Sequence, residues 1–214
     1  MTLGARDAEA LRRAFLSTLP EPDRSGAPPG VSAVLIPVHL GEDGAGLLYT
    51  RRAETLRRHP GEVSFPGGRV DPTDASPVAA ALRETEEEIG LAPADLEVLG
   101  HLTDYLTYRN VLVCAYVALL REGVAPPTEP RSRDEVAQVF RVPVASLLDP
   151  ACYEARRMPD MEPGARVHYW RVRPRTIWGI TGEITARYLA HAHAWRPPDR
   201  VRVIRDPAEF LPAR

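Results

Sequence analysis

Three glutamates near the end of one predicted helix are the residues best suited to carry chemistry. Glu84, Glu87 and Glu88 lie in the segment Arg-Glu-Thr-Glu-Glu-Glu-Ile-Gly-Leu at 83–91. At about 100° per residue, Glu88 falls roughly 40° and Glu87 roughly 60° to either side of Glu84. Carboxylates at a helix C-terminus meet the negative end of the helix dipole and repel one another, so a cation is expected among them. A donor set made only of oxygen favours Mg²⁺ or Mn²⁺ over zinc.

Arg83 and the loop before the helix help to distinguish a metal site from an acidic surface. Arg83 stands one helical turn before Glu87, where a guanidinium can hold one carboxylate and leave the others for a metal. The alternative is an acidic helix face in solvent, which is the usual explanation of a charge run. A glycine-rich loop directly before the helix favours the metal site, because glycine lets the backbone approach a ligand closely.

The helix that carries the glutamates has local signals at both ends. Ser76 followed by Pro77 is typical of an N-cap and a first helical residue. Gly90 is typical of the position just past a helix end. The helix is therefore predicted over 77–89, with apolar residues such as Ile89 facing inward and the carboxylates facing the other way.

Strands are predicted on both sides of this helix, and a second long helix is predicted near the end of the chain. Together they indicate one α/β domain over 1–214, with a core at about 28–195, a peripheral N-terminal helix and a C-terminal tail. Helices are expected at 5–19, 77–89, 144–148 and 177–194, strands at 31–40, 46–50, 64–66, 96–103, 111–120, 139–142 and 167–172, and loops at 67–75 and 123–133.

Composition excludes several classes of function. The chain has 27 arginines, no lysine and a formal net charge of -2, which argues against general nucleic-acid binding. No apolar run is long enough to span a bilayer and the N-terminus lacks a signal peptide, so a cytoplasmic protein without a membrane partner is expected. Cys114 and Cys152 form neither a metal-ligand spacing nor a disulfide framework.

The glycine loop and the acidic helix together resemble the Nudix box, which pairs a glycine and an acid with Arg-Glu, an aliphatic residue, any residue, Glu-Glu, any residue and Gly. Asp74 stands for the usual Glu, eight residues rather than seven separate it from Arg83, and Thr85 replaces an aliphatic residue. The resemblance implies an α/β/α sandwich with a central mixed sheet. It also implies metal-dependent hydrolysis of a nucleoside diphosphate linked to another group. The matching residues are Gly68, Asp74, Arg83, Glu84, Glu87, Glu88, Gly90 and Leu91.

The resemblance also implies roles for individual residues. Arg83 is expected to orient Glu87 without binding the metal itself. Glu84 is expected to be both a metal ligand and a catalytic residue. The general base is harder to place, since Nudix enzymes differ in where it sits. Glu135 is favoured over Asp134, with a loop carboxylate in solvent as the alternative. The implied metal ligands are Glu84, Glu87, Glu88 and the Gly68 carbonyl.

A second motif precedes the box and narrows the substrate. Thr50-Arg51-Arg52-Ala53, Arg57, Gly61 and Phe65-Pro66-Gly67-Gly68 resemble the additional signature of the coenzyme A branch of the Nudix family. The longer spacing between Asp74 and Arg83 is also typical of that branch. The resemblance implies cleavage of coenzyme A or its thioesters to 3′,5′-ADP and 4′-phosphopantetheine or its acyl derivative. The substrate-binding candidates are Arg52, Arg57, Gly61 and Arg69.

Alternatives remain for the arginines and for the function. Arg52 and Arg57 are expected to grip phosphate, whereas the competing interpretation is a solvated loop that balances the acidic helix. One rival function is a Nudix pyrophosphatase acting on ADP-ribose or another dinucleotide. A rival from another class is a noncatalytic sensor of a nucleotide cofactor, which the intact carboxylate set disfavours. Free or acylated coenzyme A, Mg²⁺ or Mn²⁺, and the oligomeric state stay open.

Overall fold

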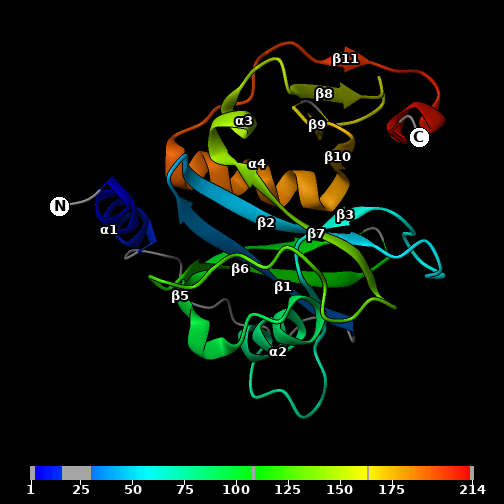
Figure 1. Ribbon diagram of the computed structural model, residues 1–214. Helices are drawn as coiled ribbons and strands as arrows, with labels where there is room; N and C mark the ends of the chain where they lie inside the picture. The colour runs from blue at the N-terminus through cyan, green and yellow to red at the C-terminus, as the bar shows by residue number, and fades with distance from the viewer. Residues whose placement is uncertain (1–2, 16–29, 108, 163, 213–214) are drawn as a thin grey trace. The chain divides into compact units, whose positions relative to one another are not determined.

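The computed structural model describes residues 3–15, 30–107, 109–162 and 164–212, with side chains described from Asp7 onward. The chain divides into two compact units, Met1–Pro143 and Val144–Arg214. Figure 1 shows the strands and helices of each unit. The single domain expected over 1–214 stays a prediction.

The first unit is built on a mixed sheet of seven strands. The strand order is β3-β2-β1-β6-β5, with β4 also paired to β1 and β7 also paired to β2. Strands β1 and β6 run parallel, and every other pair in this sheet is antiparallel. This confirms the predicted α/β class with a central mixed sheet. The strands are β1 (Gly30–Gly41), β2 (Gly44–Arg52), β3 (Val63–Ser64), β4 (Gly67–Arg69), β5 (Leu96–Leu106), β6 (Val111–Leu120) and β7 (Val136–Pro143).

Helix α2 (Pro77–Ile89) begins and ends where its local signals predict. The Ser76 side chain accepts a hydrogen bond from the Ala79 amide at 3.2 Å, which satisfies one of the unpaired donors of the first turn. Gly90 adopts a φ of 78°, and its amide donates to the Glu86 carbonyl at 3.0 Å. Because this left-handed conformation favours glycine, the sequence stops the helix at that point.

The buried face of α2 contacts β1, β4 and β6 of the sheet. Ala80, Ala81 and Ile89 join a core cluster with buried residues of β1 and β6 such as Leu35 and Tyr116. The two alanines leave room for the helix to lie close to the sheet, and Ile89 packs its C-terminal end against the same cluster.

Helix α1 (Leu3–Phe15) contacts β1, β2 and β5 within the first unit. Leu11 and Phe15 are buried, and Arg12 forms a two-pronged ion pair with Glu97 of β5 at 2.9 and 2.8 Å. The predicted helix at 5–19 is confirmed in the described part of that range; its last residues, 16–19, lie outside the described residues.

The second unit contains a four-stranded sheet in the order β10-β9-β8-β11. Helix α4 contacts β9 and β10. The buried Trp170 indole donates to the Leu147 carbonyl of α3 at 2.8 Å, which ties that short helix to the strands. The elements are α3 (Val144–Leu148), β8 (Tyr153–Arg157), β9 (Val167–Val172), β10 (Arg175–Trp178), α4 (Gly179–His193), β11 (Arg202–Val203) and the 3-10 helix η2 (Pro207–Phe210).

Several predicted boundaries are wrong. The start of the loop expected at 67–75 is strand β4, because Gly67–Arg69 pairs with β1 at a distance in sequence. The helix expected at 177–194 begins at Gly179, since Ile177 and Trp178 belong to β10 and pair with β9. Strands β8 and β11 were not anticipated. No helix of the described residues is long and apolar enough to cross a membrane.

Candidate active site

Two consecutive glycines let β4 lie between β1 and α2. Gly67 has a φ of 145°, and a Cβ there would stand 2.2 Å from the Ala33 carbonyl oxygen. A Cβ on Gly68 would stand 2.5 Å from the carboxyl carbon of Glu84. Any larger side chain would therefore displace either the sheet or the Glu84 carboxylate. The glycines bring the β4 backbone against Glu84, one of the predicted metal ligands.

Glu88 is buried, which corrects the expectation that the carboxylates all face away from the core. Only 4% of the residue is exposed, and the Gly67 amide donates to its Oε2 at 3.3 Å. Burial raises the pKa of Glu88 to about 8, and the neighbouring carboxylates Glu84 and Glu135 add to this while the Gly67 amide and Arg52 oppose it. A buried carboxyl with one weak donor is poorly stabilised as an anion unless a further cation is supplied.

Arg83 connects the helix to the loop that follows β4. Its Nε and Nη2 donate to the two oxygens of Asp74, each at 3.0 Å, and Nη2 also donates to the Arg69 carbonyl at 3.3 Å. Its Nη1 donates to Glu84 at 3.0 Å and to Glu87 at 3.2 Å. One guanidinium thus holds a loop carboxylate and two of the predicted ligands.

The electrostatics of these residues follow from that arrangement. The hydrogen bonds from Arg83 lower the pKa of Asp74, whose side chain is 7% exposed. Burial raises the pKa of Glu84, although Arg83 opposes that shift and the charges of Glu87 and Glu135 support it. Glu87 is the outermost of the three glutamates, with 58% of its side chain exposed.

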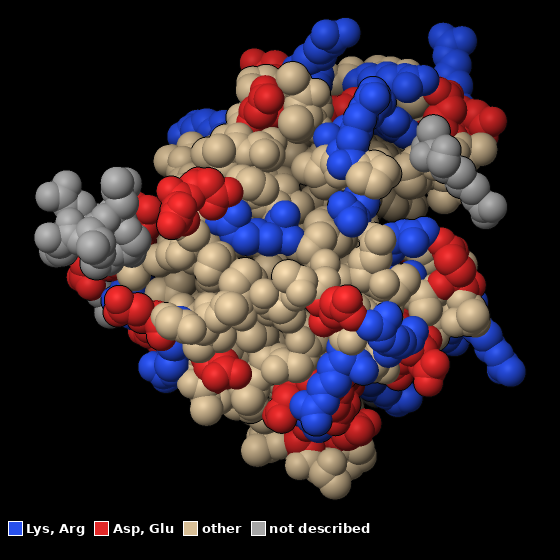
Figure 2. Space-filling model, viewed as in Figure 1, with Lys and Arg blue, Asp and Glu red and all other residues tan. Residues whose placement is uncertain are grey.

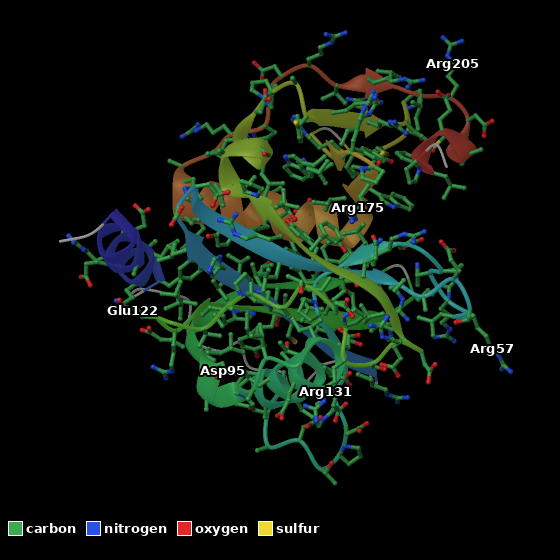
Figure 3. The ribbon with its side chains drawn as sticks, in the orientation of Figure 1. Arg57, Asp95, Glu122, Arg131, Arg175 and Arg205 are labelled. Atoms are coloured by element: carbon green, nitrogen blue, oxygen red, sulfur yellow. The ribbon has the colours of Figure 1, made fainter. Side chains whose placement is uncertain are left out.

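The loop between β6 and β7 is attached to the end of α2. The Glu88 carbonyl accepts hydrogen bonds from the Arg131 amide at 2.9 Å and the Ser132 amide at 3.3 Å. The Arg131 side chain lies beside α2 in Figure 3, with its Nη1 3.5 Å from Glu86 Oε1. No sequence pattern predicts this attachment, because carbonyl groups left unpaired at a helix end accept any amide that the fold brings to them.

Glu135 is placed by the same loop. Its carbonyl accepts from the Ala53 amide at 2.8 Å, so its backbone is tied to the segment that follows β2. Its charge influences the pKa values of both Glu84 and Glu88. A pocket of about 480 Å³ is lined by Glu135 together with Arg83, Glu86, Glu87, Arg131 and Ser132.

None of the predicted substrate-binding residues is among those that line this pocket. The charge of Arg52 lowers the pKa of Glu88, and its buried Nε has no hydrogen-bond partner among the described residues. Arg57 is exposed and points outward in Figure 3. Gly61 has a φ of 70°, and a Cβ there would meet the Glu54 carboxylate at 2.6 Å, so the turn itself accounts for the glycine. The Arg69 carbonyl contacts Arg83, whereas its side chain is exposed.

The donor set suits a hard divalent cation in type, since it consists of carboxylates beside a glycine backbone. Within the described residues, however, no three acidic, histidine or cysteine side chains already converge as a metal-binding group. The geometry explains this, because the Arg83 guanidinium lies against both Glu84 and Glu87 and takes the position of a cation between them. Glu87 is exposed enough to change rotamer, which is the movement that a shared metal would require.

Comparison with known proteins agrees with this arrangement. The NUDIX domain matches residues 29–160. A protein of Photorhabdus laumondii named "Uncharacterized Nudix hydrolase NudL" is 35% identical over 177 residues, covering 83% of this chain and 92% of its own length. The protein of that name from Escherichia coli K12 is 39% identical over 155 residues, covering 72% and 78%.

The chain also resembles a solved structure. The crystal structure of a MutT/nudix family protein from Enterococcus faecalis matches with a TM-score of 0.48 at 16% identity, covering 87% of this chain and 73% of that chain. The family assignment rests instead on the sequence matches, which span both the glycine loop and the acidic helix. The chain belongs to the Nudix hydrolase family.

Proposed function

We propose that this Nudix hydrolase is a divalent-metal-dependent pyrophosphatase that cleaves coenzyme A or its thioesters. The products are 3′,5′-ADP and 4′-phosphopantetheine or its acyl derivative. The hydrogen bond from the Gly67 amide to Glu88 Oε2, at 3.3 Å, is the observation that carries the proposal. Gly67 belongs to the motif before the box and Glu88 to the box itself, so this contact joins the substrate signature to a predicted metal ligand.

The carboxylates supply the metal-binding part of the proposal. Glu84, Glu87 and Glu88 would hold Mg²⁺ or Mn²⁺, with the Gly68 carbonyl as a further oxygen donor. Such a cation, when bound, neutralises the pyrophosphate and lowers the pKa of a coordinated water. Arg83 keeps Glu84 and Glu87 in place, and Asp74 in turn keeps Arg83 in place.

Glu135 is the proposed acceptor of the proton from the attacking water. Its carboxylate lines the same pocket as Glu87, and its backbone is anchored to the amide of Ala53, directly after Arg52. A carboxylate that borders the metal-binding residues can accept a proton from a water molecule held there. Glu84, whose carboxylate lies against Gly68 of β4, is the second proposed catalytic residue and would act as a metal ligand.

The arginines supply the specificity. Coenzyme A carries a pyrophosphate and a separate 3′-phosphate, and guanidinium groups bind phosphate through paired hydrogen bonds. Arg52, which carries a buried Nε without a partner among the described residues, is the arginine proposed to bind the pyrophosphate. Arg57, Gly61 and Arg69 complete the proposed substrate set, and exposed Arg57 is the candidate for the 3′-phosphate.

The test is hydrolysis by the purified protein with Mg²⁺ or Mn²⁺. Coenzyme A and acetyl-coenzyme A are compared with ADP-ribose, NADH and diadenosine polyphosphates, and the products are separated by chromatography. The expected result is the highest kcat/KM on a coenzyme A substrate, with 3′,5′-ADP formed. A preference for any substrate that lacks both the 3′-phosphate and the pantetheine arm would overturn the proposal, and binding without any product would favour the sensor.

A pair of arginine variants tests the specificity directly. Arg52→Gln is expected to lower kcat/KM for coenzyme A by about 10-fold to 100-fold, as expected for loss of one charge-assisted hydrogen bond to phosphate. Arg58→Gln is the matched control, since Arg58 is exposed in the same segment and is not among the predicted site residues. Equal losses in the two variants would show that Arg52 acts only through general charge.

A further inference from the structure

The two units of the chain carry opposite charge. Residues 144–214 contain twelve arginines against eight aspartates and glutamates, whereas residues 1–143 contain fifteen arginines against twenty-one. Figure 2 shows blue side chains gathered over β8 and β11, which both belong to the second unit. An excess of guanidinium groups in one compact unit favours anionic ligands there.

A pocket of about 320 Å³ lies within this basic unit. Its polar wall contains Arg157 at the end of β8, Arg166 just before β9, and Asp199. Its apolar wall contains Val201 and Val203. The combination of two cations, one carboxylate and an apolar wall is suited to a small ligand that has both a charged and a carbon-bearing part.

The charges of the two arginines in this pocket are not neutralised by carboxylates of the described residues. Arg166 donates through Nε to the Gly164 carbonyl at 3.4 Å and through Nη1 to the Pro198 carbonyl at 3.2 Å. These carbonyls fix the guanidinium without cancelling its charge. The Nε of Arg157 is buried and has no hydrogen-bond partner among the described residues. Because no carboxylate of the described residues pairs with either guanidinium, an anion in the pocket would supply the missing countercharge.

We propose that this pocket binds the phosphoryl group of a small phosphate ester that also carries a hydroxyl group. A phosphate monoester bears roughly -1.5 to -2 charges at pH 7, which matches two guanidinium groups better than a single carboxylate does. Asp199 can accept a hydrogen bond from the hydroxyl group. Val201 and Val203 cover the carbon atoms that join the two groups.

This site differs in position and chemistry from the proposed pyrophosphatase site. None of its lining residues belongs to the Nudix box or to the motif before it. It also contains a single carboxylate, so it is not suited to hold a divalent cation among several acids. The proposal therefore stands or falls separately from hydrolysis of coenzyme A.

Isothermal titration calorimetry on the full chain tests the site, with inorganic phosphate, glycerol 3-phosphate and acetate as separate probes. Glycerol 3-phosphate is expected to bind more tightly than inorganic phosphate, with acetate weakest. The titration is repeated in Arg52→Gln, which removes the arginine proposed to bind phosphate in the other site. Binding that is unchanged in Arg52→Gln supports the pocket, whereas binding that disappears there assigns the phosphate to the first unit and overturns the inference.

Variants of the pocket locate the bound group. Arg157→Gln and Arg166→Gln are each expected to weaken binding of glycerol 3-phosphate at least 10-fold. Arg205→Gln, which changes an exposed arginine outside the pocket (Figure 3), is expected to leave it within about 2-fold. Equal weakening in all three would show only general charge attraction and would overturn the proposal.

A second variant guards against loss of the fold in Arg157→Gln. Val203→Asp places a carboxylate on the exposed apolar wall, where 58% of the residue is accessible and no core contact is removed. It is expected to weaken phosphate binding at least 10-fold, with the circular dichroism spectrum and the coenzyme A hydrolysis unchanged. Undiminished phosphate binding in this folded variant would overturn the proposal.

Discussion

Both units of this chain contain a cluster of glutamate and arginine side chains, but carboxylates are in excess in one cluster and guanidinium groups in the other. In the first unit, Arg83 alone contacts both Glu84 and Glu87, while the buried Glu88 has no ion pair among the described residues. In the second unit, Glu154 contacts Arg156 at 2.8 Å, Arg202 at 3.7 Å and also Arg171. One region has more carboxylates than cations, and the other has more cations than carboxylates.

The excess of arginines around Glu154 and of carboxylates around Glu88 shifts the pKa values of these two glutamates in opposite directions. Burial alone would raise the pKa of Glu154, but the hydrogen bonds from Arg156 and the charges of Arg171 and Arg202 reverse that effect and lower it. Burial raises the pKa of Glu88 to about 8, and neighbouring carboxylates reinforce the shift. The arginines around Glu154 complete a structural ion-pair network. The glutamates of α2 form a group that a further cation would complete, which supports the metal-binding proposal.

The largest expected effect is on turnover, and it separates a glutamate of α2 from Glu154 when either is replaced by glutamine. Glu84→Gln or Glu88→Gln is expected to lower turnover by more than about 100-fold, because losing a metal ligand costs more than the 10-fold to 100-fold typical of its supporting partners. Glu154→Gln is the matched control and is expected to retain turnover. Steady-state kinetics at saturating Mg²⁺ or Mn²⁺ measure this. Near-normal turnover in both glutamate variants of α2 would remove the metal assignment.

Metal-dependent stabilisation is the next effect in size. Mn²⁺ at about 100 times its Kd is expected to add about 2.7 kcal/mol to the free energy of unfolding, or roughly 5 to 10 °C in Tm. The shift should vanish in Glu84→Gln and persist in Glu154→Gln. Differential scanning fluorimetry with and without a chelator measures both. An equal shift in the two variants would place the metal outside the glutamates of α2.

The helix that carries the site could be predicted from sequence because its signals are local. Ser76 and Pro77 fix its start, Gly90 fixes its end, and the structure has the same bounds. Helical spacing also brings Arg83 within reach of Glu87, as observed. Side-chain pairs three or four residues apart depend only on the helix, so they do not require knowledge of the fold.

Features that depend on contacts distant in sequence were missed. Gly67 and Gly68 indicate a turn by local preference, yet they form a strand because β1 offers paired amides and carbonyls. Glu88 was expected on the solvent side, yet β4 contributes the Gly67 amide to it. The attachment of Arg131 to the Glu88 carbonyl is a backbone contact, which no side-chain pattern records.

Asp74 should show a smaller effect than the glutamates, because it holds Arg83, which in turn positions Glu84 and Glu87. Asp74→Asn is expected to lower turnover by about 10-fold to 100-fold and to raise the Mg²⁺ concentration needed for half-maximal activity. The control is Asp71→Asn, whose carboxylate lies 3.9 Å from the same guanidinium with 58% of its side chain exposed. A change in turnover without any change in metal dependence would contradict a positioning role.

The smallest effect is expected at Glu154 and concerns stability. Its folded-state pKa lies below the ordinary value of 4.5, so its ion pairs stabilise the protein above about pH 4.5 and are lost as the pH falls through the folded pKa. Glu154→Gln should therefore lower the free energy of unfolding at pH 7 by roughly 1 kcal/mol. The difference from the unmodified chain should disappear toward pH 3, as followed by urea denaturation. A difference that persists unchanged at low pH would show that Glu154 acts through shape, and the contrast with the glutamates of α2 would then no longer be one of charge.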